Sequence, residues 1–184
     1  MNVQRTEDGE RRENNLHILE FVYRKFYGLL YNYGIKLVNE PDRVKDFIQD
    51  IFLKIYQNND LDTIENWQVY LLRAMRNIVY DYFASRKETI NIDTVDFLLP
   101  DSSPLTASLF ALDDSDQHKQ QHLLKAIRAL PAKQQHILYL YYLRELSHKE
   151  IAEILDINPQ SSMNALSKAI HSLRAEMKWE ETAH

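Results

Sequence analysis

Cysteine is absent from this chain of 184 residues, and glycine occurs only three times. Without cysteine the protein forms neither disulfides nor thiolate metal sites, and a cysteine nucleophile is excluded. So few glycines do not suit the tight turns of a sheet, whereas leucine, lysine and glutamine are abundant and favour helices joined by short connections. The composition therefore predicts an all-α fold.

Long apolar runs are missing as well. No segment approaches the roughly 20 apolar residues of a membrane span, and the polar start of the chain is unlike a signal peptide. A glycine-rich phosphate loop is also lacking, and His118 and His122 have no third metal ligand at a matching spacing. We therefore expect a cytoplasmic protein without membrane insertion, metal, cofactor, small-molecule substrate or catalytic residue.

Basic residues are too few to balance the acidic ones, and the formal net charge is −5. This sum alone argues against binding to nucleic acid, but the acidity is concentrated in the middle of the chain. Residues 89–118 contain six aspartates and no lysine or arginine, whereas residues 119–184 contain nine basic and seven acidic residues. We interpret 89–118 as an acidic linker. It separates a polar tail, 1–14, and a first domain, 15–88, from a second domain at 119–180.

Three apolar stripes in the first half repeat at spacings of three and four, as one face of an amphipathic helix does. The first comprises Leu16, Leu19, Tyr23, Phe26, Leu30, Tyr33 and Leu37. The second comprises Val44, Phe47, Ile48, Ile51 and Ile55, and the third Trp67, Leu71, Ala74, Ile78 and Tyr82. Such helices bury their stripes against one another, which predicts a compact bundle. The linker also has apolar residues, among them Phe97, so we expect it to dock on another surface.

The segment 147–174 has the pattern of a helix-turn-helix motif. Ser147 followed by Glu150 is a capping box that starts a short helix. Asn158 and Pro159 then suit the N-cap and the first position of a second helix. The inward stripe of that second helix comprises Met163, Leu166, Ile170, Leu173 and Met177. In such motifs the second helix enters the major groove, which predicts base contacts from its exposed polar residues Gln160, Ser161 and Asn164.

Residues 67–87 interleave cations with aromatic rings. This pattern suits single-stranded DNA, because the cations hold phosphates while unstacked bases lie on the rings. The basic residues are Arg73, Arg76, Arg86 and Lys87, and the aromatic ones include Trp67, Tyr70, Tyr80, Tyr82 and Phe83. An ordinary amphipathic helix has the same pattern, so both interpretations stay open.

At these residues the chain resembles the extracytoplasmic-function group of bacterial sigma factors, in both domains and over nearly its whole length. The segment 44–52, VKDFIQDIF, resembles region 2.2, which binds core RNA polymerase, and 70–81, YLLRAMRNIVYD, resembles regions 2.3 and 2.4. The segment 130–174 resembles region 4, with Glu150, Ile151 and Ala152 matching its motif. The resemblance implies a two-domain initiation factor whose partners are core polymerase, promoter DNA and an anti-sigma factor. It also implies that the acidic linker threads toward the RNA exit channel.

The resemblance assigns residues to three interfaces. Core polymerase would contact Asp46, Gln49, Asp50, Phe52 and Leu53. Minus-ten DNA would contact Trp67, Arg73, Arg76, Asn77, Tyr80, Asp81, Arg86 and Lys87, and the loop 60–66 would help hold a flipped base. Minus-thirty-five DNA would contact His148, Lys149, Gln160, Ser161, Met163, Asn164, Ser167 and Lys168. The chain departs from many members, which carry a basic residue where Met163 and Ala165 stand and a valine where Ser162 stands.

A helix-turn-helix regulator that is not a polymerase subunit is the main alternative. It would explain the C-terminal third but would leave the segment 44–52 and the acidic linker without a role. A helical interaction protein that binds no DNA is a third hypothesis. Binding to polymerase separates the first two, and promoter binding after changes at Gln160, Asn164 and Lys168 tests the third.

Overall fold

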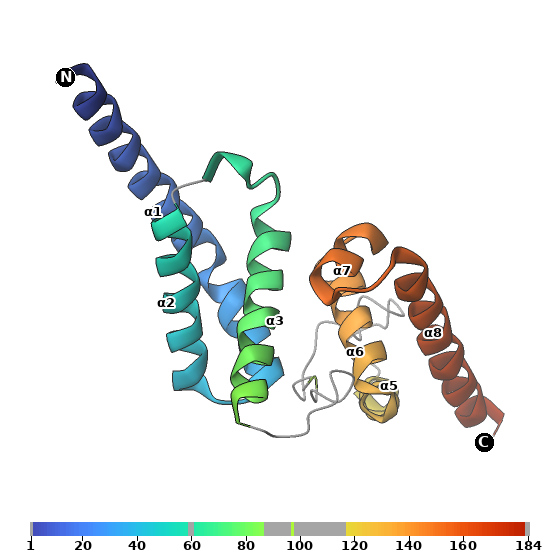
Figure 1. The fold of residues 1–184 in the computed structure, drawn as a ribbon. Coiled ribbons are helices and arrows are strands. Elements are labelled where there is room, and N and C mark those ends of the chain that lie inside the picture. Colours follow the sequence, from blue (N-terminus) through green and yellow to red (C-terminus); the bar gives the residue numbers. More distant parts are fainter. Residues whose placement is uncertain (1, 59–60, 87–96, 98–116, 183–184) are drawn as a thin grey trace. The chain divides into compact units, whose positions relative to one another are not determined.

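A computed structural model describes residues 2–58, 61–86, 97 and 117–182, and every regular element in these ranges is helical (Figure 1). The chain divides into two compact units, Met1–Glu88 and Thr89–His184. Within the described ranges, no helix combines the length and the apolar character that crossing a membrane requires. The predicted all-α class is confirmed.

The first unit is a bundle of three helices, each in contact with the other two. They are α1 (Asn2–Val38), α2 (Pro41–Asn58) and α3 (Trp67–Ser85), and the turn Leu61–Thr63 precedes α3. Asn39 adopts a left-handed conformation (φ 52°) after α1, and Pro41 then starts α2, which suits a residue without an amide hydrogen. Because α1 begins at Asn2, residues 2–14, which we expected as a polar tail, continue the first helix.

The bundle core matches the predicted stripes to different degrees. All five residues of the second stripe are buried, as predicted. In the third stripe only Leu71 is buried, and the inward face of α3 instead comprises Val69, Leu72, Met75 and Val79. Apolar residues lie on several sides of α3, so periodicity alone did not decide which side α1 and α2 would cover.

Gly34 of α1 faces α2 where a side chain has no room. A Cβ placed on its backbone would lie 2.7 Å from Cγ1 of Val44 and 3.3 Å from Sδ of Met75. Because Val44 is buried and β-branched, it does not rotate away easily. We therefore expect Gly34→Ala to lower the free energy of unfolding by about 1–3 kcal/mol in urea titrations, although alanine is the better helix former.

Gly28 provides the matched control, since it lies in the same helix and a Cβ there meets nothing within 4 Å. Gly28→Ala should raise the free energy of unfolding by about 0.5–1 kcal/mol through helix propensity alone. Equal shifts for the two variants would contradict the packing explanation.

The second unit is built around its C-terminal helix. Its elements are α5 (Gln117–Ala129), α6 (Ala132–Leu138), a π-helical segment (Tyr139–Leu143), α7 (His148–Leu155) and α8 (Pro159–Thr182). Helix α8 contacts α5, α6 and α7. Between α5 and α6, Nε2 of Gln135 donates hydrogen bonds to the carbonyls of Leu130 (2.8 Å) and Arg128 (3.2 Å), which satisfies the end of α5 where Pro131 interrupts the helix.

One residue of the predicted linker, Phe97, belongs to the core of the second unit. Its side chain is 2% exposed, and its ring stacks on His136 with 4.3 Å between centroids and 13° between planes. It also lies 5.0 Å from the ring of Tyr139. Both partners are themselves buried. The prediction that an apolar linker residue docks is confirmed for Phe97, while residues 89–96 and 98–116 lie outside the described residues.

Tyr139, which contacts Phe97, also contacts Arg144. Nε of Arg144 donates a hydrogen bond of 2.9 Å to its hydroxyl oxygen, and the guanidinium lies 5.0 Å from its ring centroid. Burial raises the pKa of Tyr139, and the nearby Arg144 opposes this effect only in part. The phenol therefore stays neutral and gives Phe97 a stable aromatic partner.

Candidate nucleic-acid and protein interfaces

An apolar groove lies on the surface of the first unit between α1 and α2. Its volume is about 490 Å³. Four of its side chains are among the exposed large apolar residues, with Leu16 at 50%, Tyr23 at 42%, Leu53 at 47% and Tyr56 at 45%. The groove is lined by Leu16, Leu19, Tyr23, Tyr27, Lys45, Gln49, Phe52, Leu53 and Tyr56. A contiguous apolar surface of this kind indicates a site for a protein partner.

The groove brings together three of the five residues predicted to bind polymerase, namely Gln49, Phe52 and Leu53. Asp46 and Asp50 are exposed on the same helix but do not line the groove, and Asp46 forms a 3.6 Å ion pair with Arg43. Three of the predicted residues therefore line the α2 side of the groove, together with Lys45 and Tyr56, and the two aspartates are exposed on the same helix outside it.

The α1 side of the groove was missed by the sequence analysis. Leu16 and Tyr23 were placed in a core stripe, but the structure leaves them at the surface, where Tyr23 packs edge-on against Phe52 at 5.1 Å and 76°. A usable signal was the row Tyr23, Tyr27 and Tyr31, whose rings follow one another along the helix. Aromatic residues of this kind are enriched at protein interfaces.

Lys45 lines the same groove as a cation. Its ammonium lies 3.0 Å from Oδ1 of Asp42, and this hydrogen bond together with the carboxylate charge raises the pKa of Lys45. The groove thus combines an apolar lining with one ammonium group that is paired with a carboxylate of the same helix.

The exposed face of α3 carries most of the residues predicted to contact minus-ten DNA. Arg73, Asn77 and Asp81 recur every four residues and are exposed, so they lie along one side of the helix. Trp67 is half-buried at the start of α3, where its ring packs edge-on against exposed Tyr70 at 6.3 Å and 74°. Polar and charged groups therefore alternate with accessible ring surface along this face.

Arg76 differs from the other predicted contacts because it is only 7% exposed. Its guanidinium lies 4.2 Å from the ring centroid of Tyr80, and Nη1 donates a 3.2 Å hydrogen bond to Oδ1 of Asn77. The structure places this cation beneath the exposed face, where it orients Tyr80 and Asn77. Arg86 is exposed with its guanidinium 4.5 Å from the ring of Tyr82, while Lys87 lies outside the described residues.

The helix-turn-helix geometry predicted from the sequence is confirmed. The amide of Glu150 donates to Oγ of Ser147 (3.3 Å), and the amide of Ser147 donates to Oε2 of Glu150 (2.8 Å), which completes the capping box. Asp156 ends α7 in a left-handed conformation (φ 53°). The side chain of Asn158 accepts a 2.7 Å hydrogen bond from the amide of Ser161, and Pro159 is the first residue of α8.

The outer face of α8 presents the predicted base contacts. Nε2 of Gln160 donates a 3.0 Å hydrogen bond to Oδ1 of Asn164, so the two amides are already oriented before any DNA binds. Met163, placed both in the inward stripe and among the DNA contacts, is 48% exposed and thus lies on the outer face. The inward stripe was wrong at this residue, because Ser162 occupies the inner position with no exposed surface. Ser167, Lys168 and Lys149 are exposed, and Ser161 and His148 are half-buried.

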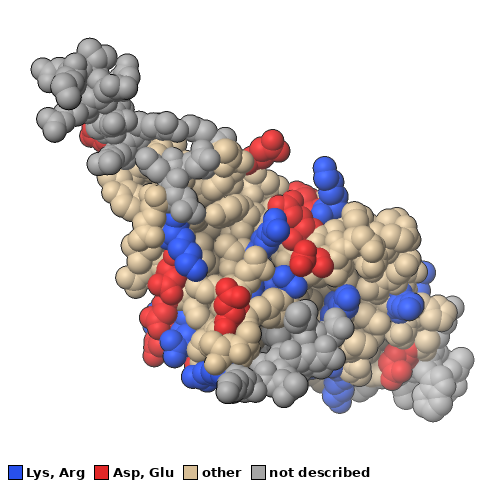
Figure 2. All heavy atoms as spheres, in the orientation of Figure 1, with Lys and Arg blue, Asp and Glu red and all other residues tan. Residues whose placement is uncertain are grey.

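Charges of both signs are interspersed over the described residues visible in Figure 2, with no broad area of one sign. Binding to DNA through phosphates alone requires a concentration of Lys and Arg. The described surface visible in Figure 2 shows no such concentration.

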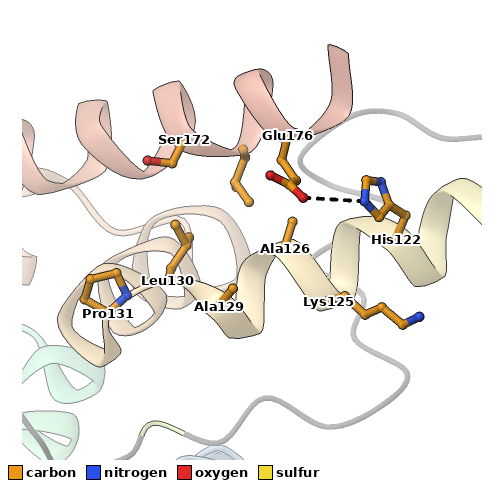
Figure 3. Close-up of a pocket in the computed structure, with 9 residues that line it drawn as sticks. His122, Lys125, Ala126, Ala129, Leu130, Pro131, Ser172 and Glu176 are labelled. Atoms are coloured by element: carbon orange, nitrogen blue, oxygen red, sulfur yellow. Dashed lines mark ion pairs between the residues drawn. The ribbon is translucent and has the colours of Figure 1, made fainter. Parts of the chain in front are cut away.

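A further cavity of about 490 Å³ lies between α5 and the C-terminal part of α8 (Figure 3). His122 of α5 and Glu176 of α8 point toward each other across it, with Nε2 and Oε1 3.9 Å apart. The described side chains include no group of three or more histidines, aspartates or glutamates placed to hold a metal ion.

Two segments of the chain match known family models. Residues 22–89 match the model described as Sigma-70 region 2, and residues 120–173 match the model described as Sigma-70, region 4. The first match ends within one residue of the boundary between the two units, and the second lies wholly inside the second unit.

Three relatives show how far the similarity extends. The ECF RNA polymerase sigma factor SigM of Bacillus subtilis is 24% identical over 164 residues, which cover 85% of this chain and 93% of SigM. SigW of the same species is 24% identical over 177 residues, covering 88% of this chain and 87% of SigW. The RNA polymerase sigma factor FliA of Yersinia enterocolitica is 31% identical over 127 residues, which cover 67% of this chain and about half (51%) of FliA.

Proposed function

The chain belongs to the sigma-70 family, within its extracytoplasmic-function group, and from this membership we propose how its two units divide the work of initiation. As an RNA polymerase sigma factor it directs transcription initiation. The observation that supports the proposal is that the two matched segments fall in separate units, one with an exposed apolar groove and the other with a helix-turn-helix.

The first unit binds core polymerase through the groove between α1 and α2. An apolar helix of the polymerase fits this groove, because Leu53 and Phe52 would then be removed from water, while the exposed Asp46 and Asp50 of the same helix would attract basic residues.

Helix α3 of the same unit holds melted minus-ten DNA. In this role Arg73 and Arg86 bind phosphates, and Trp67, Asn77, Tyr80 and Asp81 contact unstacked bases, with Arg76 supporting them from beneath.

The second unit recognises the minus-thirty-five element through its helix-turn-helix. The exposed amides of Gln160 and Asn164 are suited to adenine in the major groove. Ser161, Met163, Ser167 and Lys168 extend this surface, and His148 and Lys149 at the start of α7 contact phosphates.

Core polymerase supplies all the catalysis in this proposal, and the sigma factor needs no cofactor. The chain acts in the cytoplasm, where polymerase and promoter DNA are found. An anti-sigma factor that silenced it would have to cover the groove, the face of α8, or both.

Run-off transcription with purified core polymerase and fragmented DNA from the same source tests the proposed function. We expect transcripts only when the protein is added, and their start points locate the minus-ten and minus-thirty-five elements. Failure to produce transcripts and to co-purify with core polymerase would instead support a helix-turn-helix regulator.

Asn164→Ala tests the role of the second unit. Losing one amide contact to a base should weaken binding of the holoenzyme to such a promoter at least fivefold, because a good base contact is worth roughly 1–3 kcal/mol. Filter binding measures the affinity. His171→Ala, at an exposed residue two turns further along α8, is the matched control and should have no effect. Equal losses in both variants would argue against base recognition by Asn164.

A further inference from the structure

Ser162 is a polar residue at a fully buried position of the recognition helix. It lies in the first turns of α8 and has no exposed surface, whereas its neighbour Met163 faces outward. A hydroxyl removed from water destabilises the fold unless it finds a partner. Here Oγ of Ser162 lies 3.0 Å from Nδ1 of His148, the first residue of α7.

The His148 ring is also held by an aromatic contact. It stacks on the ring of Tyr141, with 5.0 Å between centroids and 25° between planes. Tyr141 belongs to the π-helical segment, and its ring in turn packs edge-on against Tyr142 at 5.1 Å and 75°. One hydrogen bond and one ring contact thus connect three successive elements, namely the π-helical segment, α7 and α8.

This connection constrains α8 in a way that apolar packing alone does not. Apolar contacts tolerate small sliding movements, whereas a hydrogen bond weakens steeply as its distance and angle change. The bond lies directly beneath the turn of α8 that carries Gln160 and Asn164. With Nδ1 engaged, only Nε2 of His148 remains for a phosphate, so Ser162 also sets which ring nitrogen is available to DNA.

We propose that Tyr141, His148 and Ser162 form a clamp that sets the angle of α8 on α7, and thereby the discrimination of the minus-thirty-five element. Ser162 acts here as a positioning residue, since its side chain is buried beneath the recognition face. The inference rests on the proposed recognition of that element by α8.

The experiment uses holoenzyme and two versions of a promoter mapped by run-off transcription, one intact and one with a scrambled minus-thirty-five element. The measured quantity is the dissociation constant for the scrambled promoter divided by the dissociation constant for the intact promoter. We expect Ser162→Ala to reduce this ratio about three- to tenfold, as for the loss of one hydrogen bond. His148→Phe, which keeps a ring against Tyr141, should do the same. In the double variant the ratio should fall no further than in the more strongly affected single variant, because both changes remove the same hydrogen bond. Ser172→Ala changes an exposed serine of α8 and should leave the ratio at its wild-type value.

The possible outcomes separate the proposed recognition of DNA by α8 from the proposed clamp. If the wild-type holoenzyme does not distinguish the two promoters, recognition by α8 is wrong, and the clamp fails with it. If the wild type distinguishes the two promoters and Ser162→Ala has the same ratio of dissociation constants, the clamp alone is overturned. It is also overturned if the effects of Ser162→Ala and His148→Phe add in the double variant. Imidazole ¹⁵N spectra provide a readout independent of DNA. We expect the Nδ1 resonance of His148 to shift in Ser162→Ala, and an unchanged resonance would overturn the hydrogen bond on which the clamp depends.

Discussion

Leu53→Glu is expected to weaken binding to core polymerase by about 100-fold, as for the loss of a central interface residue. Leu53 lines the apolar groove and is 47% exposed in the free protein. When a partner helix fills the groove, a carboxylate at this position would have to leave water without a dedicated partner, which is costly. In the free protein the same carboxylate reaches solvent, so the bundle should still fold.

Affinity can be measured by titrating labelled core polymerase with each variant. Phe21→Glu is the matched control, because Phe21 is still more exposed, at 65%, and belongs to the same unit but does not line the groove. Circular dichroism shows whether each variant remains helical. Unchanged polymerase affinity of a folded Leu53→Glu protein would eliminate the groove as the docking site, and equal losses in both variants would mean that the contact surface is not confined to it.

Phe97→Ala is expected to destabilise the second unit by about 2–3 kcal/mol, from the loss of a buried ring and its aromatic contacts. The residue lies in the predicted linker, outside both matched segments, yet it covers His136 and Tyr139. The destabilisation is smaller than for a phenylalanine within a helix, because the released chain regains conformational entropy.

Amide hydrogen exchange localises this effect. Exchange should accelerate in α6 and the π-helical segment, which carry the two partners of Phe97, and should stay unchanged in α2 and α3 of the first unit. Phe97→Leu is the matched control, since it keeps most of the apolar volume and should lose only about 1 kcal/mol from the ring contacts. If α6 stayed fully protected in Phe97→Ala, the docking of Phe97 would have no energetic importance.

Local chemistry explains why the helix-turn-helix could be predicted in detail. The capping box of Ser147 and Glu150, the N-cap Asn158 and the initial Pro159 each act within one turn of the chain. Their hydrogen bonds depend on sequence spacing alone, so no knowledge of distant contacts is needed. The same holds for the second apolar stripe, whose residues point to one side of α2 wherever that helix packs.

Other features depended on which helices meet. Tyr23 and Leu16 follow the core periodicity of α1 but line an open groove, whereas Val22, which is outside the predicted stripe, is buried, as is Arg76 of α3. Periodicity defines a helical face but does not say which part of that face a neighbouring helix covers. The groove, its α1 wall and the burial of Arg76 therefore emerged only when three helices were placed side by side.

The sequence by itself determined the helical class, the helix-turn-helix, the buried stripe of α2 and the family, because each depends on residue type at short, fixed spacing. Tertiary structure alone decided that Phe97 joins the core of the second unit and that Ser162 meets His148. Phe97 lies 39 residues from His136, and Ser162 lies 14 residues from His148. Contacts across such separations depend on how whole helices pack, since the free energy that selects them comes from burial and hydrogen bonding between elements and not from either segment alone.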